Sequence, residues 1–114
     1  MIFAWARLQE KRYPELALLV AVPNGGLRNK PEAMRFKAEG VRRGFPDMFL
    51  PAARGGYHAL AIELKRKFGG KVSPEQREWI DNLKAQGWYA IVSYGAGPAI
   101  EIIEAYLTGE LVRT

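Results

Sequence analysis

The sequence contains no cysteine and a single histidine, His58. The absence of cysteine excludes a disulfide-stabilised scaffold, a zinc finger, an iron–sulfur centre and a thiol nucleophile. The presence of only one histidine excludes a histidine-rich metal site and the paired histidines of zinc peptidases. Chemistry based on thiols or on several imidazoles is therefore ruled out before any motif is considered.

Long hydrophobic runs are also absent. No apolar stretch approaches the ~20 residues that a helix needs to cross a bilayer. The first residues, Met1–Arg7, lack the basic start and the long apolar segment of a secretory signal. We therefore expect a cytoplasmic protein with no membrane partner.

The composition is that of an ordinary globular chain, with 48% hydrophobic and 25% charged residues among 114. These fractions exclude disorder and coiled coil as the dominant structure. We expect residues 1–114 to form a single domain, because a chain of this length supports one modest core.

The whole sequence has a net charge of +5, and its basic residues are concentrated in the middle. Residues 28–77 hold twelve lysines and arginines against five acidic residues, and the remainder holds five basic and seven acidic residues. A basic segment of this kind indicates a polyanionic partner, most often a nucleic acid. A soluble basic protein without such a partner is the alternative, which composition does not exclude.

Apolar spacing and turn signals predict an α/β fold with a mixed sheet. Ser73 and Gln76 have the spacing of a helix capping box around Pro74. The apolar run over 16–22 favours a buried strand, although its beginning is also compatible with a helix. The expected order is a helix over 2–12, a strand over 16–22, a turn over 23–26, a helix over 31–39, strands over 47–50 and 58–65, a helix from Ser73 to Gly87, a strand over 88–94 and a helix from Pro98.

Three charged residues occupy positions where strands are seldom charged. Glu63 and Lys65 are two residues apart, so both side chains lie on one face of the predicted strand. If strands 47–50 and 58–65 form a hairpin, Asp47 lies near the end where Glu63 and Lys65 emerge. Two carboxylates and an ammonium group in this arrangement suit metal-assisted cleavage of a phosphodiester, with Mg²⁺ or Mn²⁺ as the cofactor.

The spacing of these residues resembles the PD-(D/E)XK nuclease motif. Pro46-Asp47 is followed by a gap of 15 residues and then by Glu63-Leu64-Lys65. The surrounding blocks resemble a narrower group, the virus-type replication-repair nuclease (VRR-NUC) family, over about residues 3–107. The matching blocks are Pro23–Gly26, Gly40–Asp47, Ile62–Lys65 and Ser73–Gln76. The resemblance implies a restriction-endonuclease-like core, in which a mixed sheet is flanked by helices.

The resemblance also implies roles for individual residues. Asp47 and Glu63 would ligate the divalent metal, with the main-chain carbonyl of Leu64 as a further ligand. Lys65 would act on the attacking water or the scissile phosphate, and Gln76 would reach the metal site from the start of its helix. The alternative for Gln76 is a purely structural role as the partner of Ser73 in the capping box, which by itself would account for this residue.

The family pattern also includes Gly44 and Pro46, which would shape the turn that delivers Asp47. It contains a further acidic residue, early in the first helix and before the tryptophan matched by Trp5. Glu10 follows Trp5, so no residue of this sequence takes that role. Either the acid lies upstream of Met1 or the protein uses fewer ligands.

Six basic residues around these motifs are candidates for contact with DNA phosphates. They are Arg28, Arg42, Arg43, Arg66, Lys67 and Lys71. For the segment Asn24–Arg28, contact with DNA phosphates and a plain structural turn are equally favoured. We expect His58 to be a strand-end residue, and Trp5, Trp79 and Trp88 to belong to the core or to a subunit interface.

The function that this resemblance implies is that of a metal-dependent, structure-specific DNA endonuclease. Small stand-alone relatives look like bacterial or phage homodimers similar to Holliday-junction resolvases, whose two-fold symmetry suits a four-way junction. A flap or fork nuclease with the same site, an RNA nuclease, and a binding module with impaired catalysis are the alternatives.

Overall fold

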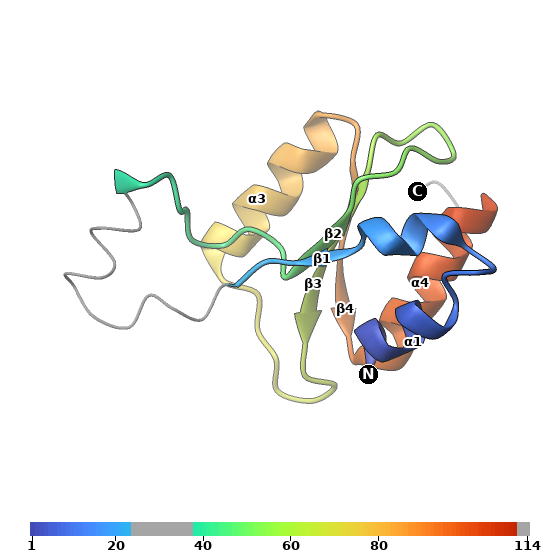
Figure 1. The fold of residues 1–114 in the computed structure, drawn as a ribbon. Coiled ribbons are helices and arrows are strands. Elements are labelled where there is room, and N and C mark those ends of the chain that lie inside the picture. Colours follow the sequence, from blue (N-terminus) through green and yellow to red (C-terminus); the bar gives the residue numbers. More distant parts are fainter. Residues whose placement is uncertain (24–37, 112–114) are drawn as a thin grey trace.

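The computed structural model describes residues 1–23 and 38–111 of the chain. Within these residues, a mixed sheet of four strands lies between helices on its two faces (Figure 1). The strands follow one another in the order β1-β2-β3-β4, with β3 and β4 parallel and the other pairs antiparallel. The elements are α1 (Ile2–Leu8), a 3₁₀ helix (Pro14–Leu18), β1 (Val20–Ala21), β2 (Met48–Leu50), β3 (Leu60–Lys65), α3 (Pro74–Ala85), β4 (Tyr89–Tyr94) and α4 (Ala96–Thr108). The predicted α/β fold with a mixed, helix-flanked sheet is confirmed.

Strand β3 divides the core into two parts because its side chains alternate between the two faces of the sheet. Leu60 and Ile62 pack into the larger apolar cluster, with residues of α1 and α4. Ala61 packs into a smaller cluster on the other face, with Ile80 and Leu83 of α3. By the same alternation, Glu63 and Lys65 lie on the face that α3 covers.

Helix α3 begins at its predicted capping box and connects β3 to its parallel neighbour β4. The Ser73 side chain accepts a hydrogen bond from the main chain of Gln76, and the Gln76 side chain accepts one from the main chain of Ser73. Both bonds satisfy N–H groups that the first turn of a helix leaves without a partner. Nε2 of Gln76 also donates a hydrogen bond to Glu63, which holds the start of α3 close to the end of β3.

The predicted buried strand over 16–22 is wrong for most of its length. Residues Pro14–Leu18 form a 3₁₀ helix, and β1 consists only of Val20 and Ala21, both of which are exposed. Leu16 and Leu19 are buried at a spacing of three residues, which matches one face of a 3₁₀ turn. The helical beginning that the sequence left open is the conformation adopted, and β1 is an edge strand.

Two helix boundaries also differ from the prediction. Helix α1 ends at Leu8 instead of residue 12, and residues 9–12 form turns. Pro14, which follows, disfavours helical geometry at Tyr13. Helix α4 begins at Ala96, two residues before Pro98, after Gly95 with a φ of 106°. Pro98 then lies in the first turn, where its missing N–H removes no helical hydrogen bond.

Residues 24–26 of the predicted turn over 23–26, Arg28 and most of the predicted helix over 31–39 lie outside the described residues. In the described part, none of the helices is long and apolar enough to cross a membrane.

Candidate active site

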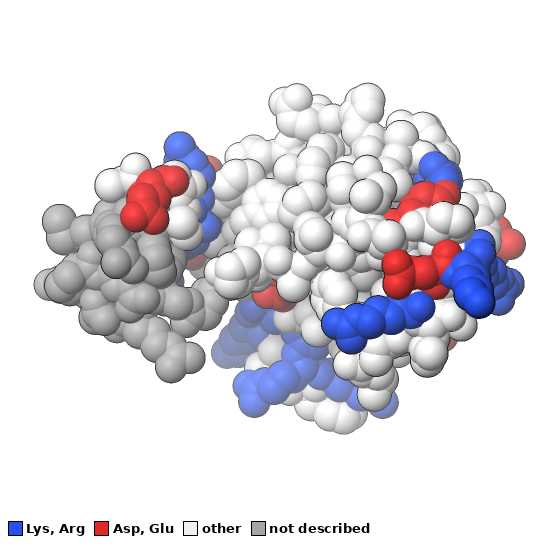
Figure 2. All heavy atoms as spheres, viewed as in Figure 1, with Lys and Arg blue, Asp and Glu red and all other residues white. Residues whose placement is uncertain are grey.

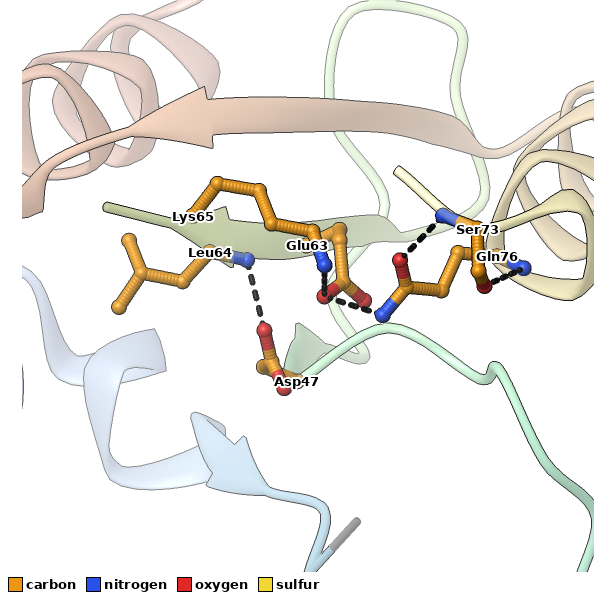
Figure 3. A network of polar contacts seen from close by, with 6 residues as sticks. All are labelled: Asp47, Glu63, Leu64, Lys65, Ser73 and Gln76. Carbon is orange, nitrogen blue, oxygen red and sulfur yellow. Dashed lines mark hydrogen bonds and ion pairs between the residues drawn. The ribbon is translucent and has the colours of Figure 1, made fainter. Parts of the chain in front are cut away.

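The predicted carboxylates and lysine come together beside the start of α3 (Figure 3). Met48 is paired with Ile62 in the β2–β3 register, which places Asp47 beside Glu63 at the same edge of the hairpin. The main-chain N–H of Leu64 donates a 2.7 Å hydrogen bond to Oδ2 of Asp47. The structure thus brings Asp47, Glu63 and Lys65 together at one edge of the sheet.

Asp47 is held in place from both sides. Its main-chain oxygen accepts a 2.7 Å hydrogen bond from the N–H of Val22, which follows β1. Its side chain is bound by Leu64 of β3, as described above. Since N–H and C=O of one residue in a strand point to the same neighbour, the Leu64 carbonyl faces the side of β3 on which Asp47 lies.

Glu63 is the most unusual side chain of the site because it is charged in type yet only 2% exposed. Its Oε2 accepts a 3.0 Å hydrogen bond from Nε2 of Gln76 and lies 3.6 Å from Nζ of Lys65. Its Oε1 is buried and receives no hydrogen bond. An oxygen in this condition carries a desolvation cost that a bound cation would offset.

The environment of Glu63 raises its pKa from the ordinary value of 4.5 to about 7. Burial is the largest cause, followed by the neighbouring Asp47 carboxyl, through hydrogen bonding and through its negative charge. The Lys65 ammonium acts in the opposite direction but does not cancel these effects. The Lys65 ammonium alone therefore does not offset the burial of Glu63 and the repulsion between the two carboxyl groups.

Gln76 combines the two roles that the sequence presented as alternatives. Its Oε1 accepts a 2.9 Å hydrogen bond from the N–H of Ser73, while its Nε2 donates to Glu63. An amide side chain can do both because it has an acceptor and a donor at opposite corners. The capping box therefore fixes the orientation of the amide group that holds Glu63.

The loop before Asp47 is fastened to α3 by contacts that the sequence did not indicate. Gly44 has a φ of 93°, and a Cβ built on it would lie 2.7 Å from the main-chain carbon of Glu75. The indole N–H of Trp79 donates a 3.0 Å hydrogen bond to the main-chain oxygen of Arg43. Phe45 packs edge-on against the Trp79 ring at a centroid distance of 5.1 Å. Trp79 thus links α3 to the turn that delivers Asp47, beyond the core role predicted for it.

The donor atoms present suit a hard divalent cation. Among the described residues, no three His, Cys, Asp or Glu side chains form a group that could hold a metal. Asp47, Glu63 and the Leu64 carbonyl offer two carboxylates and one main-chain oxygen. Mg²⁺ is commonly held by one or two carboxylates while it keeps several waters, so this small set fits Mg²⁺ or the similar Mn²⁺ better than a metal that prefers nitrogen or sulfur.

Five of the predicted DNA-contacting residues are described, and all five are exposed on loops next to the site. Arg42 and Arg43 lie before Asp47, whereas Arg66, Lys67 and Lys71 follow β3. Figure 2 shows basic side chains gathered at the end of the sheet where the loop after β3 lies. The site is therefore bordered on two sides by positive charge.

The remaining singled-out residues lie outside the carboxylate group. His58 is exposed, and its main-chain N–H donates to the Gly87 oxygen at the end of α3 remote from Ser73. Trp5 packs against the larger apolar cluster, and Trp88 lies against Phe49 at a centroid distance of 6.0 Å. Trp5 and Trp88 thus have the core positions expected for them, whereas His58 lies in a bend before β3 and not in the strand predicted over 58–65.

Comparison with known proteins points to one family. The family model of the VRR-NUC domain matches residues 1–97. A solved structure described as a VRR_NUC domain protein is similar to this chain with a TM-score of 0.81 and 32% sequence identity, covering 94% of this chain and 82% of the other. Among curated proteins, no match to this chain was found.

Proposed function

This chain belongs to the VRR-NUC family, and from that premise we propose that it is a metal-dependent DNA endonuclease that cuts branched DNA. The family membership supports a nuclease-type fold and hydrolase chemistry. The cofactor, the DNA structure that is cut and the assembly state are proposed here from the site and its surroundings.

The observation that carries the proposal is the buried carboxyl of Glu63 beside Asp47. Two adjacent carboxyl groups, one with an unsatisfied buried oxygen and a pKa raised to about 7, form a site that favours a cation. We assign Asp47, Glu63 and the Leu64 carbonyl as the ligands of Mg²⁺ or Mn²⁺. When bound, such a cation supplies positive charge for the phosphate and a water of lowered pKa.

Lys65 and Gln76 complete the proposed machinery. Lys65 lies on the same face as Glu63 and its side chain is 16% exposed, so its ammonium can reach a phosphate at the surface while remaining near the carboxylates. There it would orient the attacking water or neutralise the charge that develops on the phosphate. Gln76 would keep the Glu63 carboxylate in one orientation through its Nε2–H donor.

The basic loops support DNA as the substrate. Arg42 and Arg43 on one side, and Arg66, Lys67 and Lys71 on the other, would each bind phosphates and release counterions. We propose a homodimer acting on a four-way junction, because two related active sites would cut two symmetric strands. Exposed apolar side chains of the N-terminal segment, Met1 and Leu8, at 87% and 81% exposure, are candidate dimer contacts. The protein would be bacterial or phage-encoded and act in the cytoplasm.

The test is cleavage of four synthetic substrates, a four-way junction, a flap, a fork and a plain duplex, with Mg²⁺, with Mn²⁺ and with EDTA. We expect paired symmetric cuts in the junction, and complete loss of cutting in EDTA. Sedimentation equilibrium in the same buffer would measure the assembly state.

Other outcomes would each change one part of the proposal. Cutting of only the flap or the fork would leave the site assignment unchanged but would make that structure, and not the junction, the substrate. Preferred cutting of RNA versions of the substrates would make RNA, and not DNA, the substrate. Tight binding without cutting of any substrate would indicate a binding module, and cutting that persists in EDTA would contradict the metal site.

A further inference from the structure

The exposed aromatic side chains of the described residues gather at one end of the sheet. Phe68 is 81% exposed and Tyr94 is 46% exposed, whereas every other aromatic side chain in residues 1–23 and 38–111 is buried or partly buried. Tyr94 is paired with Lys65 in the parallel β3–β4 register, so the two side chains share a face. Both exposed rings therefore belong to the end of the sheet that carries Lys65.

Phe68 lies at the tip of a loop that returns to Lys65. A Cβ built on Gly70 would lie 2.9 Å from the Lys65 Cβ and 3.1 Å from the main-chain oxygen of Arg66. The loop thus closes directly onto the end of β3. Because consecutive Cα atoms are about 3.8 Å apart, the Cα of Phe68 is at most about 11 Å from that of Lys65. This distance corresponds to only a few nucleotide steps of a DNA strand, at about 3.4 Å each.

The charges around Phe68 indicate what covers it. Arg66, Lys67 and Lys71 are exposed in the same loop, and Nζ of Lys67 lies 5.6 Å from the centre of the Phe68 ring. Lysine is depleted from the apolar centres of protein interfaces, so this surface is poorly suited to a second copy of the chain. Cations around an exposed aromatic ring match a strand of nucleic acid, which offers phosphates to the cations and a flat base to the ring.

We propose that Phe68 stacks on an unpaired base next to the phosphate that is cut, and that Arg66, Lys67 and Lys71 bind the flanking phosphates. This inference rests on the proposed function and adds the feature of DNA that the site selects. An unpaired base is available at a branch point, flap or single-stranded end, whereas in continuous duplex it must first be unstacked. Phe68 therefore favours a strand with an unstacked nucleotide over intact duplex.

The test measures base stacking without cleavage. A junction and a flap carry 2-aminopurine at successive positions around the branch point, and binding is followed in EDTA by fluorescence and by anisotropy. The wild-type chain is compared with Phe68→Trp, Phe68→Leu and Phe68→Ala, and with Lys84→Ala as a control on the exposed, opposite end of α3.

We expect the wild type and Phe68→Trp to quench one or two adjacent probes, because both rings offer a π-face. Phe68→Leu and Phe68→Ala should lose this quenching and about tenfold in affinity for branched DNA, with little change for duplex. Lys84→Ala should behave as wild type. Since this signal needs no metal and no cutting, it separates failure of the stacking inference from failure of the proposed nuclease activity.

Three outcomes would overturn the inference. Retained affinity and retained quenching in Phe68→Ala would remove Phe68 from the DNA contact. Wild-type affinity for branched DNA in Phe68→Leu would show that an apolar side chain, and not stacking of a ring, is required. A change in the dimer dissociation constant of Phe68→Ala, with unchanged DNA binding, would assign the ring to contact between subunits.

Discussion

The two faces of β3, a strand of six residues, differ in what their side chains do. On the α4 face, Leu60 and Ile62 are at most 1% exposed and pack against Ile103 and Tyr106 in the larger cluster. On the α3 face, Ala61 and Glu63 are buried, and the Lys65 side chain that follows them in the same row is 16% exposed. The first face lowers the free energy of the folded chain through apolar burial. The second contains a buried acid that folding alone does not require.

This contrast indicates how stability and chemistry are separated. Natural active sites commonly retain groups that reduce stability, and the rest of the fold compensates for them. Here the compensation lies directly across the same strand. Changes to the apolar side chains of the α4 face should therefore alter the free energy of unfolding, and changes to the charged side chains of the α3 face should alter cleavage with little loss of stability.

The largest expected effect is on cleavage, from Lys65→Ala. We expect the rate to fall at least about a hundredfold, as is typical when a group that stabilises transition-state charge is removed, while DNA binding survives. The fold should persist because Glu63, without its ion pair, can hold its proton. Single-turnover cleavage and anisotropy measure the two effects, with Lys84→Ala as the matched lysine control. A wild-type rate in Lys65→Ala would exclude the assigned role, and Asp47→Ala should give the same loss.

Across the strand, Ile62→Ala should act on stability instead. Its side chain is 1% exposed in the larger cluster, so truncation should cost about 2–5 kcal/mol of unfolding free energy. Urea denaturation measures this cost. The cleavage rate per folded molecule should stay within about twofold of wild type if the two faces are independent. A hundredfold loss in a sample shown to be folded would break the proposed separation.

A smaller effect concerns pH. The unfolded chain releases the Glu63 proton near pH 4.5, whereas the folded chain holds it to about pH 7. Between these values the folded state binds more protons, so the contribution of Glu63 to the unfolding free energy falls as pH rises from about 4.5 to 7. The total change is at most about 3 kcal/mol. Glu63→Gln, measured by urea denaturation without divalent metal, should remove this slope; an unchanged slope would assign it to other groups.

The smallest effect is expected from a matched pair of glycines. Gly40 and Gly44 both have a φ of 93°, but a Cβ on Gly40 meets nothing within 4 Å whereas one on Gly44 meets the Glu75 main chain. Alanine at either position should strain the backbone. Only Gly44→Ala should also push the Asp47 turn away from α3. This displacement should lower the free energy of unfolding by about 1–2 kcal/mol more than Gly40→Ala does, and should reduce the cleavage rate roughly tenfold. Equal cleavage by the two variants would show that the turn tolerates this displacement.

The carboxylates and lysine of the site could be predicted from sequence because their relation is local or set by a single hairpin. Glu63 and Lys65 share a face at a spacing of two, and Asp47 follows once β2 and β3 are paired. The capping box was equally accessible, since four consecutive residues form it. The conformation of residues 16–22 could not be predicted in this way, because an apolar run does not distinguish a strand from a 3₁₀ helix that packs on the same core.

The sequence by itself determined the candidate site residues, the strand and helix that carry them, and the family to which the chain belongs. Only the tertiary structure decided that Gln76 both caps its helix and holds Glu63, that Trp79 ties α3 to the turn before Asp47, and that Glu63 is buried with an oxygen lacking a donor. These relations join residues that are distant in the chain. Sequence periodicity reports which way a side chain points along one element, whereas burial and pKa depend on what other elements place beside it.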